Sequence, residues 1–240
     1  MECRDLTLAL VGSGGDGVIS TGEIIVKAAA SEGLSCFLLK SFGPQIRGGE
    51  SSCKIRITDK ELLSIGESTD VLVCFNWSDF ARFQEEIPLS ETAIILVDEK
   101  DKTPDDQIPI EILATQTLIK VPFADLASKE VGNALTKNIV CLGVLEEFFH
   151  LPESGIEKAL RKRFEKKSKE IVSLNMTAIS VGQKWAKEYK GNVADTPMDA
   201  AKDSDFIFTC VGNDNDLREV TLGDKGLFGS AKKGAIYVDN

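Results

Sequence analysis

Leu6-Thr7-Leu8-Ala9-Leu10-Val11 is a short apolar run typical of a buried strand, and Gly12-Ser13-Gly14-Gly15-Asp16-Gly17 follows it directly. From Val18 to Ala30, apolar residues recur every three or four positions, which predicts a helix that ends near Gly33. Glycines between a strand and a helix allow backbone N–H groups to approach an anion at the helix N-terminus. The opening of the chain therefore predicts a strand, an anion-binding turn and a helix.

The remaining sequence continues the alternation of strands and helices. Further strands are predicted at 36–39, 52–58, 71–75, 93–97 and 118–121. Helical spacing follows at 124–131, 137–149, 154–168 and 170–189. The helical spacing stops near residue 191. The sequence beyond it predicts a strand at 206–211, a helix at 214–222 and a strand at 235–238. This order favours an α/β fold with a mostly parallel, Rossmann-like sheet flanked by helices, a helix-rich second half, and domains at 1–190 and 191–240.

Composition excludes several classes of function. The chain has 240 residues, of which 42% are hydrophobic, and 28 Lys and Arg against 38 Asp and Glu give a net charge of −10. This balance argues against nucleic acid or an anionic membrane as a partner. No apolar run spans a bilayer, and Glu2 and Asp5 before the first apolar stretch are unlike a signal peptide, so we expect a cytoplasmic protein. The six cysteines include no Cys-x-x-Cys pair, and the single histidine, His150, falls at a predicted helix end, so neither predicts a metal or catalytic site.

The glycine turn fits the spacing Gly-x-Gly-x-x-Gly at Gly12, Gly14 and Gly17. A dinucleotide site would normally add an acidic residue at the end of the second strand, where this chain has Lys40-Ser41. That difference argues against an NAD ribose and favours a phosphate-bearing group. Asp16 would repel an anion unless its side chain points away, and a tight turn that binds no ligand is the alternative interpretation.

A second unusual loop runs from Lys40 to Glu50 and places Gly43, Pro44, Gly48 and Gly49 around Arg47. Paired glycines after an arginine indicate close backbone approach and a guanidinium available to a carboxylate or phosphate. We expect this loop and the glycine turn to share the carboxyl edge of the sheet, where open α/β folds bind ligands. Docking of the loop against a partner subunit is an equal alternative.

These two segments resemble the gamma domain of the 2-oxoacid:ferredoxin oxidoreductases. The resemblance extends over about residues 5–188 and includes residues 138–143 and the helix around Asn175, Ala178 and Gly182. At Asp16 the chain departs from the family, in which many members have Gln. The resemblance implies candidate cofactor-binding residues Gly12, Gly14, Gly15, Gly17, Ser41, Arg47, Gly48 and Gly49.

The same resemblance implies a role inside a complex that oxidatively decarboxylates a 2-oxoacid to acyl-CoA and CO₂ and reduces ferredoxin. This chain would contribute to coenzyme A binding and to assembly, and would be inactive alone. Thiamine diphosphate and iron–sulfur clusters would reside on alpha, beta and delta partner subunits. Isolated from its partners, such a domain is expected to self-associate through its sheet edges and docking loops.

The last 50 residues resemble a different family, the 3-hydroxyisobutyrate (β-hydroxyacid) dehydrogenases, whose nucleotide-binding domain has similar middle strands. The Val211-Gly212-Asn213-Asp214 turn corresponds to one near the nicotinamide in that family. The glycine loop, the substrate-binding serine motif and the catalytic lysine of that family are missing around it. We interpret the segment as a fused or truncated tail whose strands extend the first sheet or pack beside it. An NAD-dependent dehydrogenase fragment and a non-catalytic scaffold remain alternative functions.

Overall fold

The computed structural model describes residues 5–44, 48–190, 194, 196–202, 204–209, 211 and 213–239. The chain divides into two units, Met1–Lys187 and Glu188–Asn240, which are described separately. Across the described ranges, no helix is long and apolar enough to cross a membrane.

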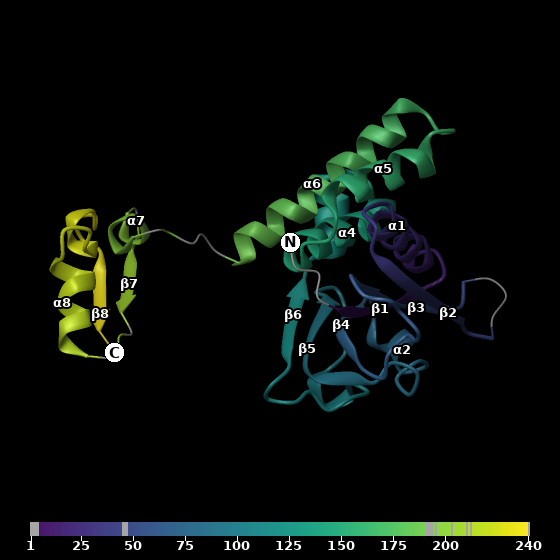
Figure 1. Ribbon diagram of the computed structural model, residues 1–240, viewed down its shortest axis with the longest axis horizontal. Helices are drawn as coiled ribbons and strands as arrows, with labels where there is room; N and C mark the ends of the chain where they lie inside the picture. The colour runs from purple at the N-terminus through teal and green to yellow at the C-terminus, as the bar shows by residue number, and fades with distance from the viewer. Residues whose placement is uncertain are drawn as a thin grey trace. The chain divides into compact units, whose positions relative to one another are not determined.

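The first unit contains a six-stranded sheet in the order β2-β3-β1-β4-β5-β6 (Figure 1). Its strands are β1 (Leu6–Ser13), β2 (Ser35–Phe42), β3 (Glu50–Thr58), β4 (Thr69–Cys74), β5 (Leu89–Asp98) and β6 (Thr117–Val121). Parallel pairing joins β1 to β4, β4 to β5 and β5 to β6. Only β3 runs against the others, between β2 and β1. The prediction of a mostly parallel sheet flanked by helices is therefore confirmed.

Helices cover the two faces of this sheet unequally (Figure 1). One face carries α1 (Val18–Ser31), α4 (Lys137–Phe149), α5 (Glu153–Phe164) and α6 (Lys169–Lys190), which share the larger hydrophobic core with the sheet. The smaller core, on the other face, centres on Trp77 and Phe80 of the short helix α2 (Trp77–Phe80). The helix-rich second half of the unit thus forms one thick layer beside α1.

Short helical segments fill the connections. They are η1 (Asp105–Gln107), α3 (Phe123–Asp125), the π-helical η2 (Leu126–Glu130) and η3 (Ala134–Thr136). The single helix predicted at 124–131 is thus divided between α3 and the π-helical turn. Helix α4 occupies the predicted range 137–149 and ends at His150, whose φ of 51° places it in the left-handed region. That residue closes the helix, as its position in the sequence indicates.

Helices α4 and α6 cross with their backbones in contact at two glycines. A Cβ atom on Gly182 would overlap the carbonyl oxygen of Val140, and one on Gly143 would overlap that of Ile179. Val140 and Ile179 are both buried. This close crossing holds α4 in place, and the start of α4 packs against the glycine turn.

The second unit is a small strand–helix–strand module. It contains α7 (Pro197–Ala201), β7 (Phe206–Thr209), α8 (Asp214–Leu222), η4 (Leu227–Gly229) and β8 (Ile236–Asp239). Strands β7 and β8 pair in parallel as a separate two-stranded sheet, so they do not extend the six-stranded one. Asn213 caps α8 by accepting hydrogen bonds from the backbone N–H groups of Asn215 and Asp216.

Candidate functional site

The glycine turn follows the central strand β1 and opens α1. Gly15 has a φ of +110° and Gly17 a φ of +75°, so both occupy the region that only glycine adopts readily. The turn is closed by the backbone N–H of Asp16, which donates to the carbonyl of Ser13 at 3.0 Å. Behind it, a Cβ on Gly17 would lie 2.5 Å from the Asn138 amide nitrogen of α4. The turn is therefore fixed from its inner side by α4.

The N-terminus of α1 has no side-chain cap. Its N-cap residue is Gly17, and the first turn contains no acidic side chain. Within the described part of the chain, the backbone N–H groups of Val18, Ile19 and Ser20 have no hydrogen-bond acceptor. The first N–H groups of a helix and its dipole together favour an anion at this position. The turn thus presents donors that a phosphate or carboxylate group would satisfy.

The predicted second loop meets this turn backbone to backbone. The N–H of Gly14 donates to the carbonyl of Gly49 at 2.7 Å. A Cβ on Gly14 would lie 2.9 Å from that oxygen and 3.0 Å from the Cα of Gly48, which has a φ of +71°. Because β3 is antiparallel to β1, the beginning of β3 lies beside the end of β1. The prediction that both loops share one sheet edge is therefore confirmed.

A pocket of about 460 Å³ lies between the turn, the second loop and α5. It is lined by Gly14, Gly15, Gly17, Val18, Ile19, Ser20, Glu23, Phe42, Gly48, Gly49, Glu50, Ser51 and Arg163. The two carboxylates of this lining are paired with cations. Glu23 binds Lys40 at 2.6 Å and Arg163 at 3.1 Å, and Glu50 lies 3.6 Å from Arg82. The hydrogen bond from Lys40 lowers the pKa of Glu23.

Asp16, which could have repelled an anion, is turned away from the pocket. Its Oδ2 accepts the backbone N–H of Ser13 at 3.0 Å, and its Oδ1 lies 2.9 Å from Lys137 Nζ. The same ammonium group lies 4.5 Å from the centre of the Phe75 ring and 3.9 Å from Asp98 Oδ2. Asp98 is buried, and desolvation raises its pKa. Lys137 therefore compensates two carboxylates at the base of the turn.

Sequence reasoning did not identify Lys137, Asn138, Asp98 or Arg163 as neighbours of the glycine turn. Asn138 and Arg163 fall within the helices predicted at 137–149 and 154–168, and the apolar spacing that predicts those helices does not show what their polar side chains contact. These residues reach the turn through the packing of α4 and α5, which no local pattern encodes.

The other predicted site residues occupy different places. Gly12 is packed between Asp16 and Phe75, since a Cβ there would lie 2.9 Å from an atom of each. Ser41 is outside the lining of the pocket, and its hydroxyl donates to Glu86 Oε2 at 2.8 Å. Arg47 falls outside the described residues. Roles for Ser41 and Arg47 in cofactor binding stay predictions.

The buried thiols are unreactive in character. Cys53, Cys74 and Cys141 are fully buried, and burial raises the pKa of all three thiols, that of Cys53 to about 12. No group of three or more His, Cys, Asp and Glu residues in the described ranges is arranged to hold a metal ion. Among the described residues, the glycine turn is therefore the candidate site that the geometry supports best.

Comparison with known proteins agrees with the resemblance seen in the sequence. Residues 7–185 match the family described as pyruvate ferredoxin/flavodoxin oxidoreductase, and residues 158–240 match the NAD binding domain of 6-phosphogluconate dehydrogenase. The chain is 30% identical over 184 residues to the 2-oxoglutarate synthase subunit KorC of Methanocaldococcus jannaschii, covering 75% of this chain and 94% of that protein.

Two solved structures share the fold. One is a 2-oxoglutarate:ferredoxin oxidoreductase from Magnetococcus marinus with 2-oxoglutarate, coenzyme A and succinyl-CoA bound, with a TM-score of 0.70 and 23% identity. That match covers 100% of this chain and 44% of the Magnetococcus chain. The other is a keto/oxoacid ferredoxin oxidoreductase gamma subunit from Geobacter sulfurreducens, with a TM-score of 0.59 and 24% identity over 75% of this chain and 98% of that subunit. The family match over residues 7–185 and the 30% identity to KorC establish that the chain belongs to the pyruvate ferredoxin/flavodoxin oxidoreductase family.

Proposed function

We propose that this chain is a gamma-type subunit or domain of a 2-oxoacid:ferredoxin oxidoreductase. The complex would convert a 2-oxoacid and coenzyme A to acyl-CoA and CO₂ and transfer two electrons to ferredoxin. Membership of the family and similarity to KorC support this assignment. Thiamine diphosphate and the iron–sulfur clusters would be held by alpha, beta and delta partner subunits.

Within the complex, the glycine turn would bind the pyrophosphate of coenzyme A. The observation that carries this proposal is the uncapped start of α1, where three residues that line a pocket have backbone N–H groups with no acceptor among the described residues. Gly15 fits such a ligand, because a Cβ at this position would meet no protein atom within 4 Å and would project into open space. A phosphate could therefore approach the backbone closely there. When bound, coenzyme A would supply the thiol that accepts the acyl group.

The assignment is tested first on the assembled protein. The full chain, carrying an affinity tag, is purified from its source cells under native conditions, and copurifying proteins are identified by mass spectrometry. We expect thiamine- and iron–sulfur-binding subunits, together with ferredoxin reduction that requires both a 2-oxoacid and coenzyme A. A chain that purifies alone and binds NAD(H) would contradict the proposal and favour the dehydrogenase alternative that the match at 158–240 suggests.

The glycine turn is tested with a matched pair of variants. Gly15→Ala places a methyl group in the pocket at a φ of +110°, and Gly33→Ala imposes similar backbone strain at a φ of +82°, at the far end of α1. Each substitution costs about 1–2 kcal/mol of folding stability. Only Gly15→Ala should raise the dissociation constant of coenzyme A, by about tenfold or more. Equal coenzyme A binding by the two variants would remove the glycine turn from the site.

A further inference from the structure

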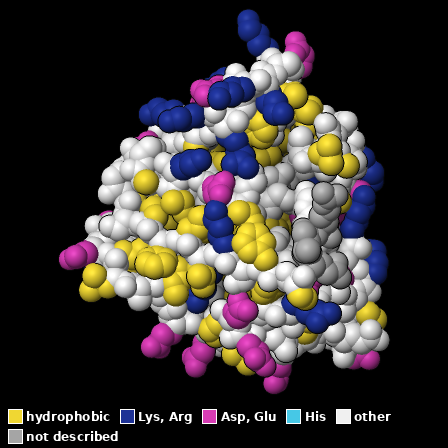
Figure 2. All heavy atoms as spheres, turned by 90° about the vertical axis from the view of Figure 1, so that its right-hand side faces the viewer, with side chains coloured by type: hydrophobic (Ala, Val, Ile, Leu, Met, Phe, Trp, Pro, Cys, Tyr) yellow, Lys and Arg dark blue, Asp and Glu magenta, His cyan; other side chains and the backbone are white. Residues whose placement is uncertain are grey.

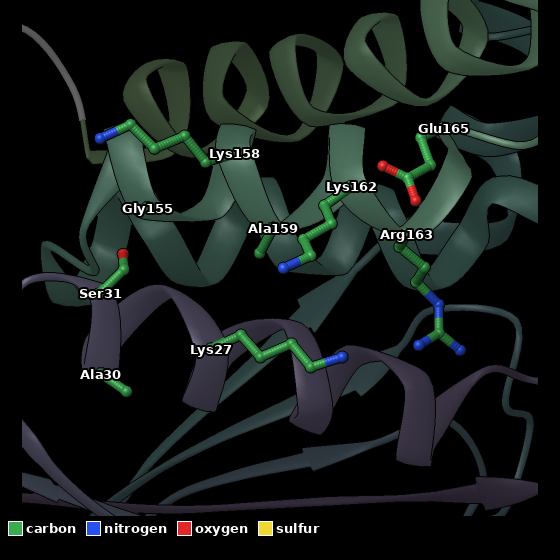
Figure 3. A pocket seen from close by; sticks show the side chains of 9 residues that line it. All are labelled: Lys27, Ala30, Ser31, Gly155, Lys158, Ala159, Lys162, Arg163 and Glu165. Atoms are coloured by element: carbon green, nitrogen blue, oxygen red, sulfur yellow. The ribbon is translucent and has the colours of Figure 1, made fainter.

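A second cavity, of about 660 Å³, lies between α1 and α5 (Figure 3). The helices approach closely at one end, since a Cβ on Gly155 would lie 2.6 Å from the carbonyl oxygen of Ala28. Small side chains, Ala30 and Ala159, line the groove between them. Because these side chains leave the space open, the long side chains at its borders can converge on a bound group.

The borders of this groove are cationic. Lys27 from α1 and Lys158, Lys162 and Arg163 from α5 line it, with Glu165 as its only acidic residue among those described. Figure 3 shows Lys27 and Lys162 extending into the space between the helices, and Arg163 extending from α5 toward α1.

Most of this positive charge has no partner in the protein. Over residues 5–44 and 48–190, Lys27, Lys158 and Lys162 form no ion pair, whereas Arg163 is held by Glu23 at 3.1 Å. Figure 2 shows Lys and Arg side chains gathered in the upper part of the face formed by the β2 edge, α1 and α5. In a chain with a net charge of −10, such a concentration of cations creates a local positive potential that favours an anionic ligand.

The groove continues from the pocket at the glycine turn. Ser20 and Glu23 of α1 line that pocket, and Lys27 and Ser31 line the groove, so residues spaced by three or four positions form one face of the helix. Arg163 lines both cavities. Along the helix axis, Ser20 and Lys27 are separated by about 10 Å. A ligand with one phosphate group at the turn and another further along α1 would therefore contact both sites.

We propose that Lys27, Lys162 and Arg163 bind the 3′-phosphate of coenzyme A, an inference that rests on the function proposed above. Coenzyme A carries a pyrophosphate and, on its ribose, a separate phosphomonoester with a charge of about −1.5 to −2 at pH 7. The pyrophosphate would occupy the turn and the phosphomonoester the groove. Ion pairing with Glu23 fixes the Arg163 guanidinium, while the two lysines supply charge not used by the protein. The groove would thus distinguish coenzyme A from its dephosphorylated form.

The test compares coenzyme A with dephospho-coenzyme A, which lacks only this phosphate. Binding of each is measured by calorimetry to the complex purified with the full chain. The wild type should bind coenzyme A about tenfold more tightly, because the phosphate gains charge-assisted contacts. In the double variant Lys27→Ala/Lys162→Ala, the ratio of the affinity for coenzyme A to that for dephospho-coenzyme A should fall close to one. The affinity for dephospho-coenzyme A itself should not change. As a control for net charge, Arg161→Ala/Lys129→Ala removes two cations that pair with Glu157 and Asp125, outside the groove, and should keep the ratio.

The outcomes separate this inference from the proposed function. If the wild type binds both compounds equally, the groove is not a 3′-phosphate site, although the proposed function stands. If the lysine variants weaken assembly with partner subunits and leave the ratio unchanged, the groove binds an acidic protein surface, and the inference is overturned. If the complex binds neither compound, the proposed function fails and the inference fails with it.

Discussion

The crossing of α4 and α6 leads to a prediction about stability, because it depends on two glycines. In the substitution Gly182→Ala, the new Cβ would overlap the Val140 carbonyl oxygen and lie 3.0 Å from the Val144 nitrogen. Both atoms belong to the backbone of a buried helix and cannot rotate away, so the helices must separate by roughly 1 Å to restore ordinary contact distances.

The expected cost follows from this separation. A gap of that size forfeits about a quarter to a half of the dispersion energy of each contact across the crossing. Overpacking in a core costs about 1–3 kcal/mol and sometimes more, whereas alanine recovers about 1 kcal/mol of helix propensity. Since backbone meets backbone here, we place Gly182→Ala at the upper end, with a net loss of about 2–4 kcal/mol. Gly143→Ala should behave alike, and the double variant should cost less than the sum because one separation relieves both clashes.

The assay is thermal unfolding followed by tryptophan fluorescence. Both tryptophans, Trp77 and Trp185, belong to the first unit, so their signal reports that unit alone. A loss of this size should lower Tm by roughly 4–16 °C. Ser180→Ala, at an exposed position of α6, is the control and should change the stability by less than about 0.5 kcal/mol. A Tm for Gly182→Ala equal to or above that of the wild type would refute the close crossing.

Two further predictions concern buried charges. Burial raises the pKa of Glu146, whose Oε1 accepts a hydrogen bond from Gln183, from 4.5 to about 7. The folded state therefore holds a proton that the unfolded state releases between these values, and stability falls as pH rises from about 5 to 8. Glu146→Gln should remove this fall, so urea titrations at pH 8 should show it about 1–3 kcal/mol more stable than the wild type, with no such gain at pH 4.5. Lys137→Met leaves the Asp16 and Asp98 carboxylates without their cation and should cost about 2 kcal/mol at pH 7. Because protonation of the carboxylates relieves this cost, an undiminished loss at pH 4 would contradict the assigned pairing.

Local patterns in the sequence predicted much of the fold. The helix at 137–149 and the tail helix at 214–222 have the predicted bounds, because periodicity and flanking residues mark them. Strand β2 extends three residues beyond its predicted end at Leu39, through Phe42. The residues beyond that point are polar or exposed, and their pairing with β3, rather than burial, keeps them extended.

The position of β3 in the sheet was not predictable from the same patterns. This position changes what the glycine motif implies about a dinucleotide cofactor. The test for a dinucleotide site assumes that the second strand lies beside the first, so that an acidic residue at its end reaches the ribose. Here β3 is inserted between them, antiparallel to both, and β2 lies at the outer edge. Lys40 at the end of β2 therefore pairs with Glu23 on α1. The absence of an acidic residue at that position does not by itself distinguish cofactors, because the topology removes the position from the ribose.

The same insertion explains the character of the pocket. It brings the loop before β3, with Gly48 and Gly49, against Gly14, where a dinucleotide-binding fold would have a neighbouring parallel strand. The pocket is then enclosed by backbone on two sides and by α5 on the third, where Arg163 reaches Glu23 from 140 residues away in the sequence. A contact over that separation depends on how α5 packs against α1. The selectivity proposed for the groove therefore depends on the tertiary structure, and the glycine motif alone encodes only the turn for which anion binding is proposed.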